Sequence, residues 1–320
     1  MSGITELYRK YRPNTLEEVR GQDSIISTLK KKIEKGELPH AIMLSGASGI
    51  GKTTIARILA RELGCFIDPR TKDLSTLTFK EINCADARGI ETIRQISETI
   101  KFKPISGECS VWLLDEFHQV TTTGQDALLK TLEEPPSHAY IFLCTTDPGK
   151  IKPTIKTRCL PIALQPLKQK TMEELLRSII KKEKRNISEE VIMQITDISE
   201  GSARKGLVLL EQIIDLEESQ QLELLSKEEA SHQAFEVAQA LMKKKGAVPW
   251  SEMAKILSTV TEPQETIRQI ILKYCTSVML KGGPNSARAY YISTCFSSMF
   301  QDSGKNGLVS ACYEIICMGK

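Results

Sequence analysis

Long apolar runs and aromatic residues are scarce in this sequence. Aromatic residues make up 5% of its 320 residues, and the longest unbroken apolar runs, such as YIFLC, are far shorter than the ~20 residues that a membrane span requires. The first residues, MSGITELYRKYRP, are charged where a signal peptide would be apolar. We therefore expect a globular protein of the cytoplasm that has no membrane partner.

Cysteine pairs at metal-binding or redox spacing are also missing. The nine cysteines stand at positions 65, 84, 109, 144, 159, 275, 295, 312 and 317 without a CxxC pair. Reduced and mostly packed thiols are expected, and a zinc site is not. The net charge of +3 is too small to indicate nucleic-acid binding by itself, so any DNA contact depends on the local placement of basic residues.

The segment AIMLSGASGIGKTTIARILARELGC contains a phosphate-binding loop. An apolar run before the pattern GxxxxGK[ST] predicts a strand, and apolar residues at helical spacing after it predict a helix that ends near Gly64. The glycines let successive N–H groups face one anion, Lys52 can reach the β- and γ-phosphates, and Thr53 can ligate Mg²⁺. A chance glycine-rich turn is the alternative, which the flanking strand and helix disfavour. The predicted loop comprises Gly46, Ala47, Ser48, Gly49, Ile50, Gly51, Lys52, Thr53 and Thr54.

A second apolar strand ends in the carboxylates that hydrolysis requires. The run over 111–114 is followed by Asp115 and Glu116. Asp115 can hold Mg²⁺ through water, and Glu116 can orient and deprotonate the attacking water. A solvated acidic strand end is the common alternative. His118 is expected to be a local hydrogen-bonding residue and not a catalyst.

A third apolar strand, AYIFLCTTD, ends in Thr145, Thr146 and Asp147. The carboxyl end of a strand beside the phosphate-loop strand is where a side chain can sense the γ-phosphate. An Asx or Ser/Thr turn before Pro148 fits the pattern equally well. The two interpretations remain open at this point.

Two arginines stand apart from these strands. SEGSARKGLVLLEQII predicts a helix that Ser202 caps. Arg204 then lies in its first turn, against the helix dipole, where an arginine tends to need an anion; a solvated helix start is the alternative. Arg158, in IKTRCL, has no evident role in a single chain, and Cys159 beside it is expected to be a small packing residue.

In combination, these segments resemble an ATPase subunit of a sliding-clamp loader, in the AAA+ class. The resemblance covers roughly residues 1–215, with the motifs in the family's order, and the TRC and YRP…GQ boxes together make it specific. The segments that carry it are KYRPNTLEEVRGQ, GASGIGKTT, EINCADARGI, LLDEFH, ALLKTLEEPP, CTTDPGKI, TRC and GSARKGL.

The resemblance implies roles for residues around the nucleotide. Tyr8, Arg12 and Val19 fall in the box that lines the adenine and ribose pocket. Thr146 falls at the first sensor of the γ-phosphate. Arg204 falls at the second sensor, which touches the γ-phosphate and closes a lid.

Other implied roles concern DNA and neighbouring subunits. Asn83 falls where a polar residue can hold the catalytic glutamate away from water until DNA binds. Gln125 falls where the family couples neighbouring subunits, and Arg158 looks like an arginine finger that acts in trans on the ATP of a neighbour. Arg88 resembles a residue that faces DNA phosphates. On charge alone, two further candidates for a DNA surface are Lys101 and Lys103, for which a solvated loop is the favoured interpretation.

The resemblance also implies ATP and Mg²⁺ as cofactors and a role in replication. Such a subunit opens a sliding clamp and loads it onto primer–template DNA, which it holds by the phosphate backbone. The implied partners are other loader subunits in a ring of about five, the clamp, primer–template DNA and, indirectly, the replicative polymerase. The compartment would be the cytoplasm of a bacterium or of a phage-infected host, or the nucleus of a eukaryote.

We expect an α/β fold with a parallel sheet, followed by two helical parts. Residues 1–165 would form the P-loop AAA+ domain, with strands near positions 41, 80, 111, 140 and 160. Residues 166–228 would form a helical lid, and residues 229–320 an all-α collar that joins subunits. The four-cysteine zinc module of bacterial loader ATPases is absent, which makes the chain similar to compact archaeal, eukaryotic or phage subunits.

Three other functions share part of this pattern. Another AAA+ DNA motor, such as a helicase loader or a branch-migration ATPase, would have the P-loop, sensors and lid, but is not expected to combine the TRC and YRP boxes. A largely structural loader subunit usually has a broken P-loop, whereas Lys52, Thr53, Asp115 and Glu116 are all present. A P-loop kinase or GTPase would lack the lid helix.

Overall fold

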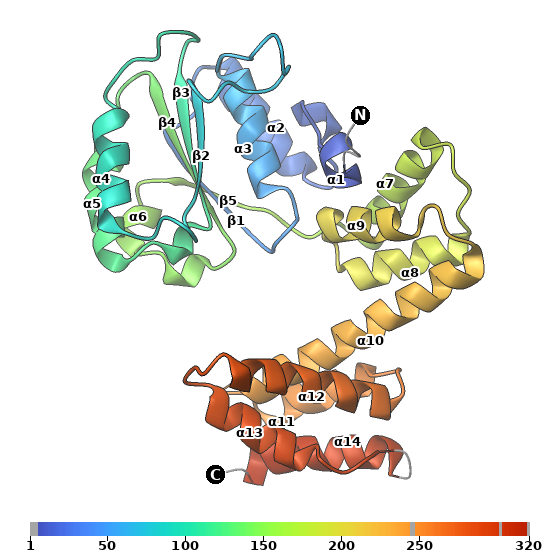
Figure 1. Ribbon diagram of the computed structural model, residues 1–320. Coiled ribbons are helices and arrows are strands. Elements are labelled where there is room, and N and C mark those ends of the chain that lie inside the picture. Colours follow the sequence, from blue (N-terminus) through green and yellow to red (C-terminus); the bar gives the residue numbers. More distant parts are fainter. Residues whose placement is uncertain (1–5, 244–246, 301–302, 319–320) are drawn as a thin grey trace. The chain divides into compact units, whose positions relative to one another are not determined.

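The computed structural model describes residues 6–243, 247–300 and 303–318, and the chain divides into two compact units, Met1–Asp215 and Leu216–Lys320 (Figure 1). The nucleotide domain expected over 1–165 lies within the first unit, whereas the lid expected over 166–228 lies within it only as far as residue 215. The expected boundary at 228/229 falls inside helix α10 (Glu218–Met242). The three-part division therefore stays a prediction, and each unit is described by itself.

The first unit contains a five-stranded, wholly parallel sheet, as predicted. The strand order is β2-β3-β4-β1-β5. Parallel strands need crossover helices that bury both faces of the sheet, which explains their nearly continuous apolar runs. The strands are β1 (Ala41–Ser45), β2 (Phe79–Asn83), β3 (Ser110–Asp115), β4 (Ala139–Thr145) and β5 (Leu160–Ala163).

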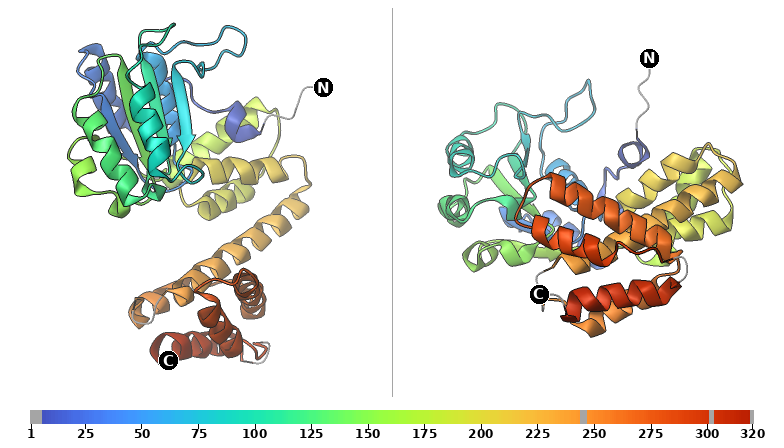
Figure 2. Two further views of the ribbon diagram at one scale, coloured as in Figure 1. Left: turned by 60° about the vertical axis from the view of Figure 1, so that its left-hand side comes forward. Right: turned by 60° about the horizontal axis from the view of Figure 1, so that its bottom comes forward.

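Helices cover both faces of this sheet (Figures 1 and 2). Because side chains alternate along a strand, Val111 and Leu113 of β3 pack into the core on one face, and Trp112 and Leu114 pack into the core on the other. The first face is covered by α2 (Asp23–Glu34) and α3 (Lys52–Glu62), and the second by α4 (Ile90–Thr99), α5 (Thr122–Glu133) and α6 (Pro153–Lys156).

The carboxyl ends of the strands bring the polar motifs to one edge. Ser45, before the phosphate loop, is the register partner of Thr145, and Asn83 is the register partner of Asp115. Strands β3 and β4 are themselves adjacent. The phosphate loop, the acidic pair and the threonine pair therefore come together where ligands bind in open parallel sheets.

A helical region, which was predicted to act as a lid, completes the first unit. It consists of α7 (Gln169–Lys182), α8 (Glu189–Ser199) and α9 (Ala203–Ile213), and α9 begins after Ser202, whose hydroxyl accepts a hydrogen bond from the N–H of Lys205, as predicted. The N-terminal helix α1 (Leu7–Lys10) is tied to α9 by a hydrogen bond from the N–H of Leu7 to the carboxylate of Glu211. Lys10 and Tyr11 both donate to Glu183 at the end of α7.

The second unit is all-α and has its own core. Leu241, Ile271, Phe296 and Ile315 are fully buried there, whereas other apolar side chains remain exposed, among them Phe235. The sequence alone could not separate these two groups. The helices are α10 (Glu218–Met242), α11 (Trp250–Thr259), α12 (Gln264–Leu280), α13 (Ser286–Cys295) and α14 (Gly304–Tyr313), followed by a π-helical turn over Glu314–Met318.

The thiols are mostly packed, as predicted. Seven of the nine cysteines are buried and none forms a disulfide. Burial raises the pKa of Cys159 to about 12, which makes it a packing residue and not a reactive thiolate. Within the ranges that the structure describes, no helix is long and apolar enough to cross a membrane.

Candidate functional site

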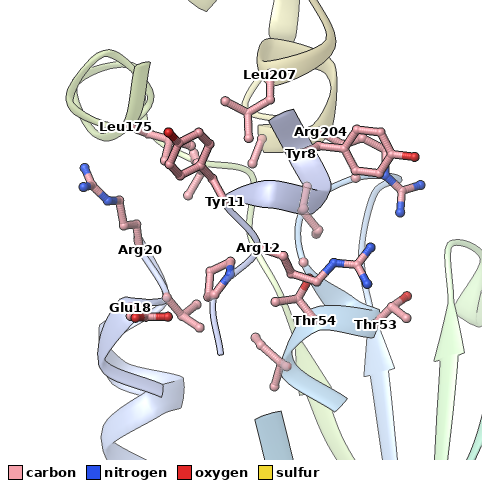
Figure 3. Close-up of a pocket in the computed structure, with 18 of the residues that line it drawn as sticks. Tyr8, Tyr11, Arg12, Glu18, Arg20, Thr53, Thr54, Leu175, Arg204 and Leu207 are labelled. Atoms are coloured by element: carbon pink, nitrogen blue, oxygen red, sulfur yellow. The ribbon is translucent and has the colours of Figure 1, made fainter. Parts of the chain in front are cut away.

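A cavity of about 470 Å³ lies between the phosphate loop, the N-terminal segment and the lid (Figure 3). Most of the residues predicted to bind nucleotide line it. Gly46 and Ala47 do not; their carbonyls instead accept hydrogen bonds from Lys52. The predicted residues that line it are Tyr8, Arg12, Val19, Ser48, Gly49, Ile50, Gly51, Lys52, Thr53, Thr54, Asp115, Glu116 and Arg204.

Part of the cavity wall was not predicted. Leu175 and Ile179 of α7 and Leu207 of α9 contribute an apolar surface, and Tyr11 contributes an aromatic ring. A planar, weakly polar base suits such a wall better than phosphates do. Tyr11 stands beside Arg12 in the YRP box, so its position was a signal that the sequence offered. The α7 residues offered no such signal in the sequence, because their apolar spacing is the spacing of any packed helix.

The phosphate loop is closely packed around its glycines. Gly49 has a φ of 76°, and a Cβ there would lie 2.3 Å from the hydroxyl oxygen of Ser202 and 3.1 Å from Cβ of Arg204. The N–H of Arg204 donates to the Gly49 carbonyl over 3.2 Å. Glycine at this position therefore lets the lid helix begin directly against the loop.

Three cationic side chains, those of Lys52, Arg12 and Arg204, line the cavity. Lys52 is 6% exposed, and burial is the main cause that lowers its pKa. The pKa of Arg12 is lowered by burial and then by its neighbour Arg57, with a smaller effect from Arg204. Cations held together in this way destabilise one another, and an anion bound among them would relieve that cost. The arrangement suits a polyphosphate.

The two predicted magnesium ligands are in contact. The hydroxyl of Thr53, at the start of α3, donates to Oδ2 of Asp115, at the end of β3, over 2.9 Å. Hydroxyl and carboxylate oxygens are the ligands that Mg²⁺ prefers, and the ion usually takes few ligands from the protein because phosphates and water supply the rest. These two residues therefore fit the ion.

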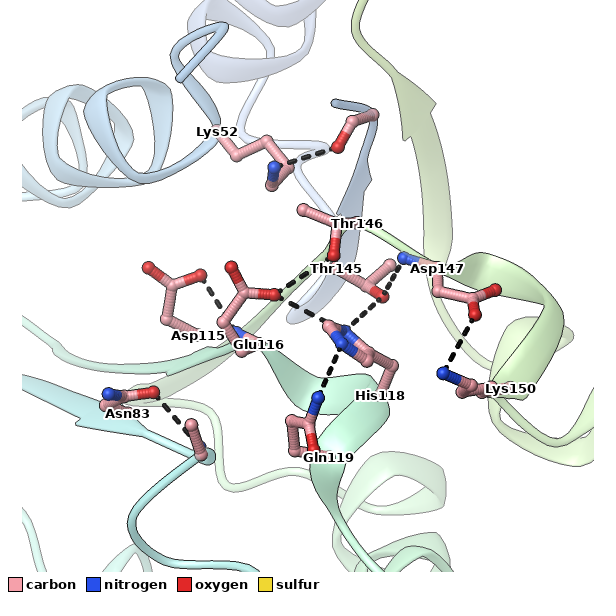
Figure 4. A network of polar contacts seen from close by, with 12 residues as sticks. Lys52, Asn83, Asp115, Glu116, His118, Gln119, Thr145, Thr146, Asp147 and Lys150 are labelled. Carbon is pink, nitrogen blue, oxygen red and sulfur yellow. Dashed lines mark hydrogen bonds and ion pairs between the residues drawn. The ribbon is translucent and has the colours of Figure 1, made fainter. Parts of the chain in front are cut away.

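Glu116 occupies a strained backbone position (Figure 4). Its φ of 50° and ψ of 41° are left-handed, which costs a residue other than glycine about 1–2 kcal/mol. Hydrogen bonds from its own N–H to Asp115 and from the N–H of Gln119 to its carbonyl hold the turn, and the fully buried Phe117 anchors it. Strain retained in this way is typical of functional positions.

The turn interpretation of the third strand end is confirmed, and the sensor interpretation, which concerns Thr146, stays a prediction. The hydroxyl of Thr146 donates to Oε2 of Glu116 over 3.2 Å, so the predicted sensor and the predicted base are in contact. Asp147 accepts from the N–H of Gly149, and its own N–H donates to the hydroxyl of Thr145. The turn therefore uses Thr145 and Asp147, and leaves Thr146 to the site.

Asn83 and Arg88 are exposed and engaged locally. The Asn83 amide donates to Asp86 and accepts from the N–H of Ala85, so it does not hold Glu116 in this structure. Arg88 donates from Nε to the carbonyl of Ala85 over 2.7 Å. Their predicted roles, in a DNA-dependent switch and in DNA binding, stay predictions.

Gln125 and Arg158 lie outside the cavity. Gln125 is 1% exposed and donates to the carbonyls of Val120 and Lys150, while its oxygen accepts from the N–H of Lys152. Gln125 thereby joins two parts of the chain: the acidic segment, which runs from Asp115 to Val120, and the loop that leads through α6 to Arg158. The Arg158 guanidinium binds Glu133 and the Thr154 carbonyl.

Comparison with known sequences gives one consistent result. The family model described as DNA polymerase III, delta subunit, matches residues 21–168. The chain is 31% identical over 98% of its length to a DNA polymerase III subunit gamma of Buchnera aphidicola subsp. Schizaphis graminum, and covers 92% of that protein. It is 36% identical to the subunit gamma of the Acyrthosiphon pisum strain and 33% identical to subunit tau/gamma of Haemophilus influenzae, but covers only 62% and 33% of those proteins.

Comparison with solved structures supports the fold alone. The Thermotoga maritima RuvB Holliday junction branch migration motor matches with a TM-score of 0.51 over 86% of this chain and 82% of that one. A point mutant of the same protein matches with a TM-score of 0.57 over 78% and 86%. Both are 18% identical in sequence, so the likeness reports a shared fold and nothing about function.

Proposed function

This chain belongs to the DNA polymerase III gamma family of clamp-loader subunits, and on that premise we propose that it is an ATPase subunit that uses ATP to load a sliding clamp onto primer–template DNA. The observation that carries the proposal is the contact of Glu116 with Thr146 at the strand edge where Thr53 meets Asp115. The residues proposed as base, sensor and magnesium ligands therefore lie together beside the phosphate loop.

Different residues of the cavity suit different parts of the nucleotide. Tyr11 and the apolar wall from α7 and α9 suit the base, and Lys52, Arg12 and Arg204 suit the phosphates. Arg12 was predicted to line the adenine and ribose pocket; its half-buried guanidinium beside two other cations favours the phosphate side. Thr53 and Asp115 would hold Mg²⁺, which when bound neutralises charge on the β- and γ-phosphates.

Glu116 would orient the attacking water and accept its proton. Thr146 fixes one carboxylate oxygen and thereby limits where the other can point. Arg204 is held to the phosphate loop through its own N–H and lies with its guanidinium carbon 5.5 Å from the centre of the Tyr8 ring. The lid could therefore report to the N-terminal helix whether the site is filled.

Completion of the site would require a neighbouring subunit. Arg158 does not line the cavity of its own chain, and its partly exposed pairing with Glu133 is worth only about 0.2–1 kcal/mol. An arginine released at so small a cost could serve the ATP of the next subunit, with Gln125 linking its loop to the acidic segment. The proposed partners are other loader subunits, a sliding clamp and primer–template DNA, with Arg88 facing DNA phosphates.

A pair of variants tests this proposal. Glu116→Gln keeps the shape of the site but removes the base, so we expect it to bind ATP without hydrolysing it and to accumulate on clamp and primed DNA. Lys52→Ala should fail to bind ATP and should form no such complex. ATP binding and trapping can be measured by filtration and by sedimentation of the assembled complex. Normal hydrolysis in Glu116→Gln, or ATP-bound protein that never accumulates on clamp and DNA, would contradict the proposal.

A further inference from the structure

His118 lies directly behind the proposed catalytic base. It belongs to the short helix η2 (Phe117–Gln119), and its side chain is 9% exposed. Nδ1 lies 3.4 Å from Oε2 of Glu116 and 3.3 Å from the hydroxyl oxygen of Thr145, while Nε2 lies 3.0 Å from the amide nitrogen of Gln119 (Figure 4). Both ring nitrogens are therefore engaged, which a histidine that only fills space does not require.

The contact with Gln119 determines the tautomer. An amide nitrogen can only donate a hydrogen bond, so Nε2 of His118 accepts one from Gln119. In the neutral ring the proton then resides on Nδ1, which faces Glu116 and Thr145. The imidazole thus presents a donor to the catalytic carboxylate and not a competing lone pair.

The polar contacts of the Glu116 side chain fall on one of its two oxygens. Oε2 receives the hydroxyl of Thr146 and faces the Nδ1–H of His118. Among the described residues, Oε1 has no hydrogen-bond partner in the protein. The carboxylate is therefore asymmetric: one oxygen is anchored, and the other is left to take a proton.

We propose that His118 is a positioning residue for Glu116, which anchors Oε2 so that Oε1 is the oxygen that accepts the proton of the attacking water. This inference rests on the proposed ATPase function of the same site. In the step itself, the water oxygen attacks the γ-phosphorus, one water proton moves to Oε1, and ADP leaves. His118 gives up no proton in this step and does not touch the substrate.

The inference explains why the strained turn includes a histidine. The left-handed backbone of Glu116 sets only the start of a long and flexible side chain. Thr146, which follows β4, holds that side chain from one direction, and His118, from the turn itself, holds it from another. Two donors from different elements restrict the carboxylate far more than one does, and such restriction is what a general base needs.

The test compares His118→Leu, which keeps bulk, with His118→Asn, whose amide nitrogen can replace Nδ1 as a donor. We expect His118→Leu to lower kcat for ATP by about 10- to 100-fold, with KM and ATP binding within about twofold of the wild type. His118→Asn should recover most of the loss. His138→Leu is the matched control, because it removes a partly buried imidazole that binds the carbonyls of Ile100 and Phe102, and its kcat should not change.

A double variant separates positioning from general damage. If His118 acts through Glu116, adding His118→Leu to Glu116→Gln should lower the residual rate by less than about twofold, whereas independent effects would multiply. A normal kcat in His118→Leu, no recovery in His118→Asn, or a multiplied loss in the double variant would each overturn the inference while the slow Glu116→Gln variant upholds the proposed ATPase. A Glu116→Gln variant as fast as the wild type would overturn both.

Discussion

Removal of the Gln125 side chain should remove the hydrogen bonds that hold the loop leading to Arg158, and should destabilise the first unit. Three hydrogen bonds, of 3.2, 3.3 and 2.9 Å, join this buried amide to the backbones of Val120, Lys150 and Lys152. Each buried bond contributes about 1 kcal/mol net, and the backbone groups left behind lose their partner. We therefore expect Gln125→Ala to lower the free energy of unfolding of the first unit by about 3 kcal/mol.

Urea denaturation followed by tryptophan fluorescence measures this change. Trp112 lies in β3 of the first unit and Trp250 in α11 of the second, so a Trp250→Phe background leaves one reporter in the unit of interest. Gln125→Met keeps the bulk and loses the bonds, and should be destabilised nearly as much as the alanine variant. Gln95→Ala, at an exposed position of α4, is the control and should shift stability by less than about 0.5 kcal/mol.

The outcome for Gln125→Met decides between bonding and packing. A methionine variant as stable as the wild type would show that the three bonds do not hold the loop. A loss below about 1 kcal/mol in Gln125→Ala would mean that water replaces them. Either result would refute the interpretation of Gln125 as the link between the acidic segment and the arginine loop.

Two other predictions concern the subunit interface and acid stability. Arg158→Ala should retain ATP binding but lose about 10³- to 10⁵-fold in hydrolysis by the assembled complex, and mixing with Lys52→Ala subunits should restore part of it; normal hydrolysis by Arg158→Ala alone would exclude action in trans. In the second unit, hydrogen bonds from Arg268 and the N–H of Phe300 lower the pKa of Glu265 from 4.5 to about 2. Its stabilising effect is therefore complete above pH 4.5 and lost as the pH falls toward 2, so Glu265→Gln should flatten the acid dependence of the Trp250 unfolding signal, and an unchanged slope would contradict this assignment.

Short-range patterns predicted most of the first unit. Each of the five strands lies near its expected position, and the phosphate loop and the Ser202 cap depend on residues within a few positions of one another. Such features are local because glycine φ angles, capping hydroxyls and buried apolar runs act over one or two turns of chain.

Contacts between distant segments could not be predicted in this way. His118 meets Thr145 across 27 positions because β3 and β4 are neighbours in the sheet, and Arg158 meets Glu133 across 25 positions. The family's motif order predicted that Asn83 would contact Glu116. Its amide instead donates a hydrogen bond to Asp86, three residues further along the chain. In each case the partner depends on sheet register or on local competition for hydrogen bonds.

The second unit shows a different limit. α10 begins at Glu218 and continues to Met242, so the boundary expected between residues 228 and 229 lies inside one continuous helix. The apolar residues of α10 are not confined to one face of the helix. Leu241 is buried and Phe235 is exposed because of the helices that pack beside α10. A sequence carries little information about that choice until the neighbouring helices are known.

ATP hydrolysis by the assembled complex tests clamp loading most directly, when it is measured alone, then with primed DNA, and then with the cognate sliding clamp added. We expect primed DNA and clamp each to raise the rate, and both together to raise it most, with no stimulation in complexes that carry Arg158→Ala. A wild-type rate that neither primed DNA nor clamp alters would contradict a clamp-loading function and would favour another AAA+ motor that acts on DNA.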